Sequence, residues 1–446
     1  MEKVVCAQYR FRVGSNDCGT SRFTEYQYVH ELFGCGTSLM FFCIKNLSFG
    51  TMMITDADRE IVKSTVPLLR ENAKEIASTF YRDLFKAHPA LLNTFNQTNM
   101  KIGAQPLALA NAIYLAAENI DHLDVLMPWI YTIGYKHRAM MVKPIHYKVV
   151  GHFLLNAIAK TLDDKATPEV LNAWSIAYST IASVFIDVEK ELYADLGDDG
   201  QKSFIPLKIV KKELIADETI TALALERCDG RAICPYLAGQ YLTLRVQKEG
   251  HFHNRHYSLT HPFNGKTYNV AIKQEKDEQP LGVVSNEIAE NFFEGDTILA
   301  SLPAGNFVLV NDANHYLFIA GGIGITALLA MIKDLKNKGK LDLVTLIYYV
   351  SKKGQGASIE EIQSLLDKDQ YIPLDKSNPL TKDLLQSKLT SGTQVYMCGS
   401  PSFLNTARTY LSECNHPESQ VHFETFQPRL SLLKNAANNK SKTRVL

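Results

Sequence analysis

Three polar side chains in the first half of the chain fall on helical faces that are otherwise apolar. The apolar and glycine neighbours at helical spacing are Ile130, Ile133 and Gly134 for His137, then Val150, Gly151 and Leu154 for Tyr147, then Ile181 and Phe185 for Glu189. A buried carboxylate without a partner is costly, so Glu189 must either reach water near a helix end or find a buried hydrogen-bond partner. One such histidine is more often a core residue than a ligand, but the three residues together predict a site.

A glycine run in the second half has the composition of a phosphate-binding turn. Gly321-Gly322-Ile323-Gly324 follows an apolar run and opens a helical pattern. Glycines let the backbone approach a pyrophosphate, and a helix N-terminus supplies N–H donors. The next strand ends in Val350-Ser351-Lys352-Lys353, without an acidic residue for a ribose 2′-hydroxyl. Both lysines could pair with a 2′-phosphate, although we favour solvated loop charges, and the choice between NADH and NADPH stays open.

The elements that must position these residues change type along the chain. From Thr55 to about Asp195 the apolar spacing is helical, beginning with a capping-box pattern of Thr55 and Asp58. The expected later helices are 107–119, 127–141, 145–162 and 168–193. The glycine- and charge-rich segment 195–202 is typical of a linker.

Beyond the linker the pattern becomes strand-like. Short β-rich runs predict a small antiparallel barrel with strands at 207–210, 219–225, 241–246, 256–259, 268–272 and 297–302. From Tyr316 onward, strands at 316–320, 343–350, 395–398 and 421–426 alternate with helices near 326–338, 359–368 and 401–413. This alternation predicts a parallel α/β domain.

Composition limits the class of protein. The chain has 446 residues, of which 46% are hydrophobic and 21% charged, so about three globular domains are expected. Its 47 basic residues balance 47 acidic ones, which argues against a nucleic-acid binder. Eight cysteines at irregular spacing and without a Cys-x-x-Cys pair favour reduced thiols in a cytoplasmic protein.

The first 50 residues have no steady helical or strand period. Their longest apolar run is Leu39 to Ile44, six residues, so no transmembrane helix is expected. They also lack the pattern of a secretory signal. We interpret 1–51 as an extension of unknown role, and Met52 and Met53 leave open an alternative start.

The helical region resembles the globin domain of the flavohaemoglobin family. The matching segments, in order and spacing, are Thr79–Phe85, Thr94–Asn96, Gln105, Lys136–Arg138, Lys143–Tyr147 and Val150–His152. The resemblance implies that His137 is the proximal ligand of a haem b iron, a metal-binding role, and that Lys136 lies beside the cofactor. It implies that Tyr81 and Gln105 hydrogen-bond bound oxygen and that Phe95 wedges the haem. Tyr147 and Glu189 would form the proximal network that makes His137 more electron-donating.

The remaining two domains resemble ferredoxin reductase-like flavoproteins. Their Arg-x-Tyr-Ser motif matches Arg255-His256-Tyr257-Ser258, and Gly239-Gln240-Tyr241 matches a strand start that directs Tyr241 toward FAD. The other implied cofactor-binding residues are Gly282, Val284 and Ser285, then Gly322, Ile323, Gly324, Ile325, Thr326 and Ala327, then Cys398 and Gly399, and finally Phe426, Gln427, Pro428 and Arg429. Ala327 stands where the family usually has proline, and Ser400 separates Cys398-Gly399 from Pro401.

The resemblance implies a multidomain chain: an all-α globin domain at 52–196, an antiparallel β-barrel FAD domain at 203–311, an α/β parallel-sheet NAD(P)-binding domain at 312–433 and a polar tail at 434–446. The expected function is a nitric oxide dioxygenase that converts nitric oxide and dioxygen to nitrate, with electrons passing from NAD(P)H through FAD to haem iron. Two alternatives are an NAD(P)H-dependent reductase of ferric iron, quinones or peroxides and a haem-based gas sensor. We expect a cytoplasmic monomer that binds no nucleic acid.

Overall fold

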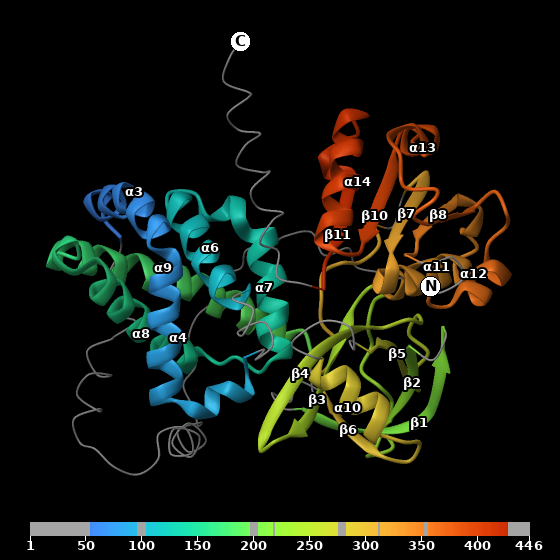
Figure 1. Ribbon diagram of the computed structural model, residues 1–446, viewed down its shortest axis with the longest axis horizontal. Helices are drawn as coiled ribbons and strands as arrows, with labels where there is room; N and C mark the ends of the chain where they lie inside the picture. The colour runs from blue at the N-terminus through green and yellow to red at the C-terminus, as the bar shows by residue number, and fades with distance from the viewer. Residues whose placement is uncertain are drawn as a thin grey trace, which may run out of the picture. The chain divides into compact units, whose positions relative to one another are not determined.

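The computed structural model describes residues 54–95, 104–196, 204–216, 219–274, 282–310, 313–351 and 356–426 (Figure 1). The predictions for 1–51, for Lys352 and Lys353, for Gln427, Pro428 and Arg429, and for 434–446 lie outside these residues. Position 105 lies in a helix, but the prediction for the Gln105 side chain is also outside what is described.

The first described region is helical, as predicted, and contains no strand between 54–95 or 104–196. Its α-helices are α3 (Asp56–Glu71), α4 (Ala73–Ala87), α6 (Ala104–Glu118), α7 (Met127–Ala139), α8 (Pro144–Leu162) and α9 (Pro168–Ala194), with short 3-10 turns η1 (Pro89–Asn93), η2 (Leu123–Leu126) and η3 (Asp163–Lys165). Thr55 and Asp58 form the expected capping box, with Thr55 N–H donating to Asp58 at 3.0 Å. Pro144 and Pro168 begin α8 and α9, where a missing N–H costs nothing.

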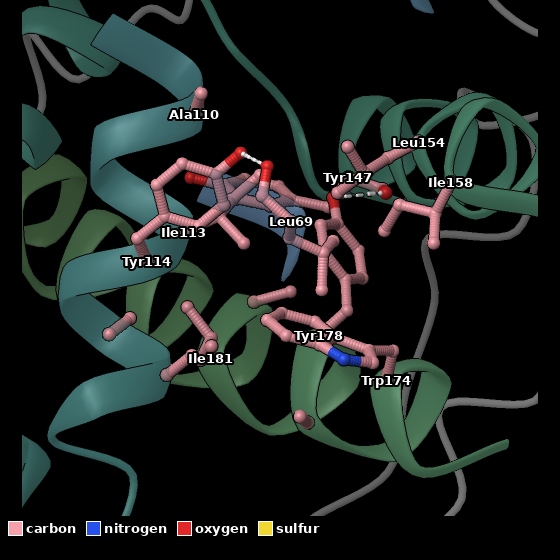
Figure 2. Close-up of a cluster of buried hydrophobic side chains, with 14 of the residues drawn as sticks. Leu69, Ala110, Ile113, Tyr114, Tyr147, Leu154, Ile158, Trp174, Tyr178 and Ile181 are labelled. Carbon is pink, nitrogen blue, oxygen red and sulfur yellow. Dashed lines mark hydrogen bonds between the residues drawn. The ribbon is translucent and has the colours of Figure 1, made fainter. Parts of the chain in front are cut away.

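The core of this region combines aliphatic packing with satisfied polar groups. Figure 2 shows Tyr114 Oη donating to Leu69 O at 2.8 Å and Tyr178 Oη donating to Tyr147 O at 2.7 Å. The ring of Tyr178 also explains Gly151, because a Cβ there would lie 2.4 Å from that ring. Helices α8 and α9 can therefore approach closely, which fixes the spacing between two of the three predicted site residues.

An antiparallel six-stranded sheet follows, in the order β4-β3-β6-β1-β2-β5. Its strands are β1 (Ile205–Ile215), β2 (Ile220–Arg227), β3 (Tyr241–Lys248), β4 (His251–Ser258), β5 (Tyr268–Lys273) and β6 (Thr297–Ala300). A bridge between Leu259 and Val270 brings the outer strands β4 and β5 together, and Thr260 N–H donates to Asn269 O at 2.9 Å. The predicted barrel is confirmed by this closure. Helix α10 (Val283–Asn291), which the sequence analysis did not predict, packs against it.

The last region is a parallel five-stranded sheet in the order β11-β10-β7-β8-β9. Its strands are β7 (His315–Gly321), β8 (Val344–Tyr349), β9 (Tyr371–Leu374), β10 (Thr393–Cys398) and β11 (Val421–Glu424). Its α-helices are α11 (Ile325–Asn337), α12 (Ile359–Leu365), α13 (Lys382–Lys388) and α14 (Pro401–Glu413), with 3-10 turns η5 (Gly322–Gly324), η6 (Leu341–Leu343) and η7 (Glu418–Gln420). The predicted parallel α/β fold is confirmed.

One described helix, α9, is long and apolar enough to cross a membrane by length and composition. It packs within the helical core through Trp174, Ala177 and Phe185, and it carries the buried Glu189.

Candidate functional site

The three polar residues singled out in the helical region form one cluster, in which Tyr147 and Glu189 are buried and His137 is partly exposed. His137 comes from α7, Tyr147 from α8 and Glu189 from α9. His137 Nδ1 lies 2.7 Å from Glu189 Oε1 and 2.9 Å from Tyr147 Oη, and Tyr147 also donates a hydrogen bond to Glu189 Oε1. The Glu189 side chain is 4% exposed, so it is the buried, partnered carboxylate that the sequence required.

This arrangement fixes the chemistry of the imidazole. Because a carboxylate can only accept, His137 carries its proton at Nδ1 and keeps the Nε2 lone pair for a metal. Burial, followed by the negative charge of Glu189, raises the pKa of Tyr147, so its hydroxyl stays protonated as a donor. Phe185 packs beside the His137 ring, with ring centroids 6.0 Å apart. The cluster is suited to hold an iron ligand of fixed orientation.

The described residues that were predicted to lie on the distal side of a haem form an aromatic group with Phe85. Tyr81 on α4 is 4% exposed. Its ring lies 5.7 Å from that of Phe95 and 5.6 Å from that of Phe85, centroid to centroid. The structure therefore brings Tyr81 and Phe95 together.

The other face of α7 contacts the barrel and the strand β11. Thr132 and Asn306 are joined by a hydrogen bond of 2.9 Å from Asn306 Nδ2, and Lys136 Nζ lies 3.9 Å from Glu424 Oε1. Arg138 donates to Pro303 O and, at 3.3 Å, to Leu192 O, although it is 5% exposed. Sequence reasoning missed the role of Arg138, because a cation in the last turn of a helix already has an ordinary explanation in the helix dipole.

The Arg-x-Tyr-Ser motif occupies the end of β4. The register pairs Tyr241 with Ser258 and Thr243 with His256, so Arg255 and Tyr257 lie on the opposite face of the strand from His256. His256 Nδ1 lies 2.8 Å from Thr243 Oγ1, and its ring lies 4.7 Å from that of Tyr241. Burial, then the nearby charges of Lys136 and Arg255, lower the pKa of His256 to about 3, so it is neutral at physiological pH.

The glycine-led segment 282–285 begins a helix. Gly282 is the N-cap of α10, whose first turn holds the buried Val284 and Ser285. This N-terminus has the N–H donors that the predicted phosphate contact requires.

The glycine turn and the cysteine turn lie side by side at the carboxyl edge of the parallel sheet. Strands β7 and β10 are neighbours, and a Cβ at Gly324 would lie 2.3 Å from the carbonyl oxygen of Cys398. Gly322 has a φ of +54°, with open space beside it. This geometry fits a pyrophosphate, because the backbone is accessible there and α11 begins immediately afterwards.

The remaining predicted residues surround that turn. Ile325, Thr326 and Ala327 form the buried first turn of α11, and Ile323 lies in η5 with its carbonyl accepting from Thr326 Oγ1 at 2.9 Å. Cys398 is buried at the end of β10, followed by Gly399, and Ser400 caps α14 through Phe403 N–H at 3.4 Å. Phe426, just after β11, is 48% exposed and available to cover a ligand.

Comparison with known proteins agrees with this arrangement. Residues 78–185 match the globin family model, and residues 297–421 match the model described as dimethylamine monooxygenase subunit DmmA-like, N-terminal domain. A flavohemoprotein of Halalkalibacterium halodurans is 37% identical over 85% of this chain and 98% of its own. The chain belongs to the flavohaemoprotein family. Flavohemoprotein A of Dictyostelium discoideum is 35% identical over 84% of this chain and 99% of its own.

A solved structure shares the whole fold. The flavohemoglobin of Malassezia yamatoensis, crystallised with bound FAD and heme, has a TM-score of 0.75 and 24% identity and covers 84% of this chain and 99% of its own. As a flavohaemoprotein, the chain is an oxidoreductase that joins a globin domain to an FAD- and NAD-binding reductase module. The predicted family and fold class are confirmed.

Proposed function

We propose that this flavohaemoprotein is an NAD(P)H-dependent nitric oxide dioxygenase that binds haem b, FAD and a reduced nicotinamide. The single observation that supports it best is the hydrogen bond of 2.7 Å from His137 Nδ1 to the buried Glu189. A carboxylate on the outer nitrogen makes the imidazole more basic at Nε2, which favours oxygen activation over simple storage.

The residues present fit the three cofactors. His137 would hold the iron, and Arg255 would neutralise the FAD pyrophosphate while Tyr257 and Ser258 contact the flavin. The open glycine turn at Gly322 would hold the nicotinamide dinucleotide. When bound, these groups supply a two-electron donor, a carrier that passes electrons singly and an iron that accepts them one at a time.

The side chains of the chain itself set the conditions for this chemistry. Glu189 holds the proton at His137 Nδ1, and Tyr147 stabilises that carboxylate with its own hydroxyl. Tyr81 and Phe95 pack edge to face on the predicted distal side, where Tyr81 would donate a hydrogen bond to a small ligand. Phe426 would cover the flavin until a nicotinamide displaces it.

The test is consumption of nitric oxide by the purified protein loaded with haem and FAD, followed with an electrode. NADH, NADPH and oxygen are added in turn, and nitrate is quantified at the end. We expect removal only when oxygen and a reduced nicotinamide are both present, with one nitrate formed for each nitric oxide consumed. The same trace identifies the preferred nicotinamide.

Three other outcomes would contradict the proposal. A reducible flavin with no nitric oxide removal, but with reduction of ferric iron, quinones or peroxides, would favour the reductase alternative. Haem that binds nitric oxide without any turnover would favour the sensor. Absence of a haem or flavin absorbance band would contradict the cofactor assignment itself.

A further inference from the structure

Two asparagines join the globin domain to strand β4 of the barrel. Asn93 ends η1, and Asn254 lies in β4. The Asn93 side-chain carbonyl accepts from Phe252 N–H at 2.8 Å, and the Asn93 backbone carbonyl accepts from Asn254 Nδ2 at 2.7 Å. Each asparagine therefore supplies one hydrogen bond of a two-bond joint.

Asn254 is held firmly on the barrel side of this joint. It is 7% exposed, and its Oδ1 accepts from Arg245 Nε at 2.7 Å across the β3–β4 pair. The Arg245 guanidinium lies over the rings of Phe204 at 3.6 Å and Phe252 at 5.1 Å. With both amide ends of Asn254 engaged, its rotation is fixed, so movement of β4 is passed on to Asn93.

The two ends of the joint reach the two candidate cofactor sites. On the barrel side, Arg255 Nη1 donates to Asn254 O at 2.8 Å, and Arg255 is the residue assigned to the FAD pyrophosphate. On the globin side, Leu91 O accepts from both Thr94 N–H at 2.9 Å and Phe95 N–H at 3.2 Å. Asn93 and Phe95 thus belong to one tight turn.

We propose that Asn93 and Asn254 are positioning residues that couple FAD occupancy at Arg255 to the distal haem pocket beside Phe95. This inference rests on the proposed binding of haem and FAD but not on the reaction they catalyse. FAD restrains Arg255 and β4, the joint restrains the turn of η1, and Phe95 then has less freedom to move aside. A bulky distal ligand must consequently bind more weakly when FAD is present.

Imidazole binding to the ferric haem tests this coupling without any electron transfer. Its affinity is measured from the shift of the haem absorbance in FAD-loaded and FAD-depleted protein. We expect FAD to weaken imidazole binding by about three- to tenfold, the range of one or two hydrogen bonds. Because coupling between sites is reciprocal, imidazole must weaken FAD binding by the same factor, which flavin fluorescence measures independently.

Two variants each remove one of the two bonds of the joint. Asn254→Leu keeps the size of the side chain but removes its amide donor, together with the acceptor for Arg245 Nε within the barrel. Asn93→Ala removes only the side-chain acceptor for Phe252 N–H. Each should bring the FAD effect on imidazole below about twofold. The control is Asn269→Ala, since Asn269 is a partly buried asparagine of the same barrel that bonds Thr267 instead, and it should keep the full effect.

The outcomes separate this inference from the proposed function. Equal imidazole affinities in FAD-loaded and FAD-depleted protein, where the absorbance of the loaded protein shows both haem and FAD, would overturn the coupling alone. An FAD effect that persists in both asparagine variants would overturn the assignment to this joint. Failure of haem or FAD to bind at all would overturn the proposed function together with the coupling.

Discussion

The candidate site of the globin domain is built from side chains, whereas that of the nicotinamide-binding domain is built from backbone groups. In the globin domain it lies in side chains from three helices, His137, Tyr147 and Glu189, which hydrogen-bond one another. In the nicotinamide-binding domain it lies in backbone at strand ends, where Gly322 has open space beside it and Gly324 lies against Cys398.

The difference shows two ways of making a polar site in an apolar fold. In the globin cluster the side chains are hydrogen-bond partners of one another, and this pairing allows the carboxylate of Glu189 to be buried. The glycine turn instead removes side chains so that N–H donors are accessible to a ligand. The first site should be sensitive to loss of a functional group, and the second to addition of a single carbon.

The largest expected effect follows from His137→Ala. Loss of the iron ligand should abolish the haem absorbance band and lower nitric oxide consumption by at least about 100-fold, beyond the range for residues that only support a ligand. Reduction of ferricyanide by NADH, which needs only the reductase module, should persist. The control is His152→Ala on α8, whose ring pairs with Asn156. Retained turnover in His137→Ala would contradict the ligand assignment.

Gly324→Ala should have the opposite effect to His137→Ala: ferricyanide reduction by NADH should fall while haem binding persists. A Cβ 2.3 Å from Cys398 O must displace backbone, which costs about 3 kcal/mol and should lower kcat/KM for NADH about 100-fold, even with ferricyanide as acceptor. Haem absorbance should remain unchanged. Gly250→Ala serves as the control, since its φ of +77° adds only backbone strain with open space around it. Normal ferricyanide kinetics in Gly324→Ala would show that the turn is not the dinucleotide site.

Glu189→Gln sharpens the comparison within the globin cluster. The neutral amide is a weaker acceptor for His137 Nδ1–H, so the iron reduction potential should rise and nitric oxide turnover should fall about 10- to 100-fold. Spectroelectrochemistry and the electrode assay measure the two effects. Glu191→Gln, on the same helix but bonded to Tyr131, should change neither. If the potential stays unchanged, Glu189 has only a structural role.

A smaller effect is expected on the distal side. Tyr81→Phe removes one hydroxyl donor, so oxygen should leave the ferrous haem about tenfold faster while flavin reduction by NADH is unaffected. Stopped-flow absorbance follows both steps. Tyr114→Phe is the matched control, because that buried hydroxyl bonds Leu69 O instead. An unchanged oxygen release rate would remove Tyr81 from the distal assignment.

The last expected effect concerns the dependence of stability on pH in the reductase module, not catalysis. Burial, followed by the charge of Lys333, lowers the pKa of His261 to about 4 from 6.5. The unfolded chain therefore binds more protons between these values, and the free energy of unfolding should decrease as pH falls from 6.5 toward 4. His261→Gln should remove about 2 kcal/mol of that decrease after allowance for partial exposure. Urea midpoints at pH 7 and pH 5 measure it; a variant with the same pH dependence as wild type would contradict the burial argument.

Much of this fold follows from local patterns. Helical spacing located α7, α8 and α9 within a few residues, because long periodic segments carry a strong signal. The same spacing placed His137, Tyr147 and Glu189 on apolar faces, although only the folded chain shows that these faces meet. Strand β9 was not predicted because Pro373 interrupts a four-residue run, which is tolerated at the edge of a sheet.

The contacts between domains could not be predicted in this way. Asn254 and Asn93 are separated by 161 residues, and polar residues at such positions are usually solvated surface groups. The hydrogen bond from Arg138 to Pro303 O could not be predicted either, because no periodicity distinguishes Arg138 from an ordinary helix-ending cation. Pairing over long sequence distances depends on the whole fold rather than on any local segment.

Arg138 fixes how the globin domain packs against the barrel, because it donates hydrogen bonds to Leu192 O and Pro303 O. An apolar interface can slide by a fraction of a helical turn at little cost, because one aliphatic contact replaces another. A buried guanidinium tolerates no such slip, since each donor must meet a carbonyl such as Pro303 O or Leu192 O. Arg138 therefore fixes the position of α7 relative to the barrel. Because His137 lies on the same helix, its position relative to the barrel is fixed as well.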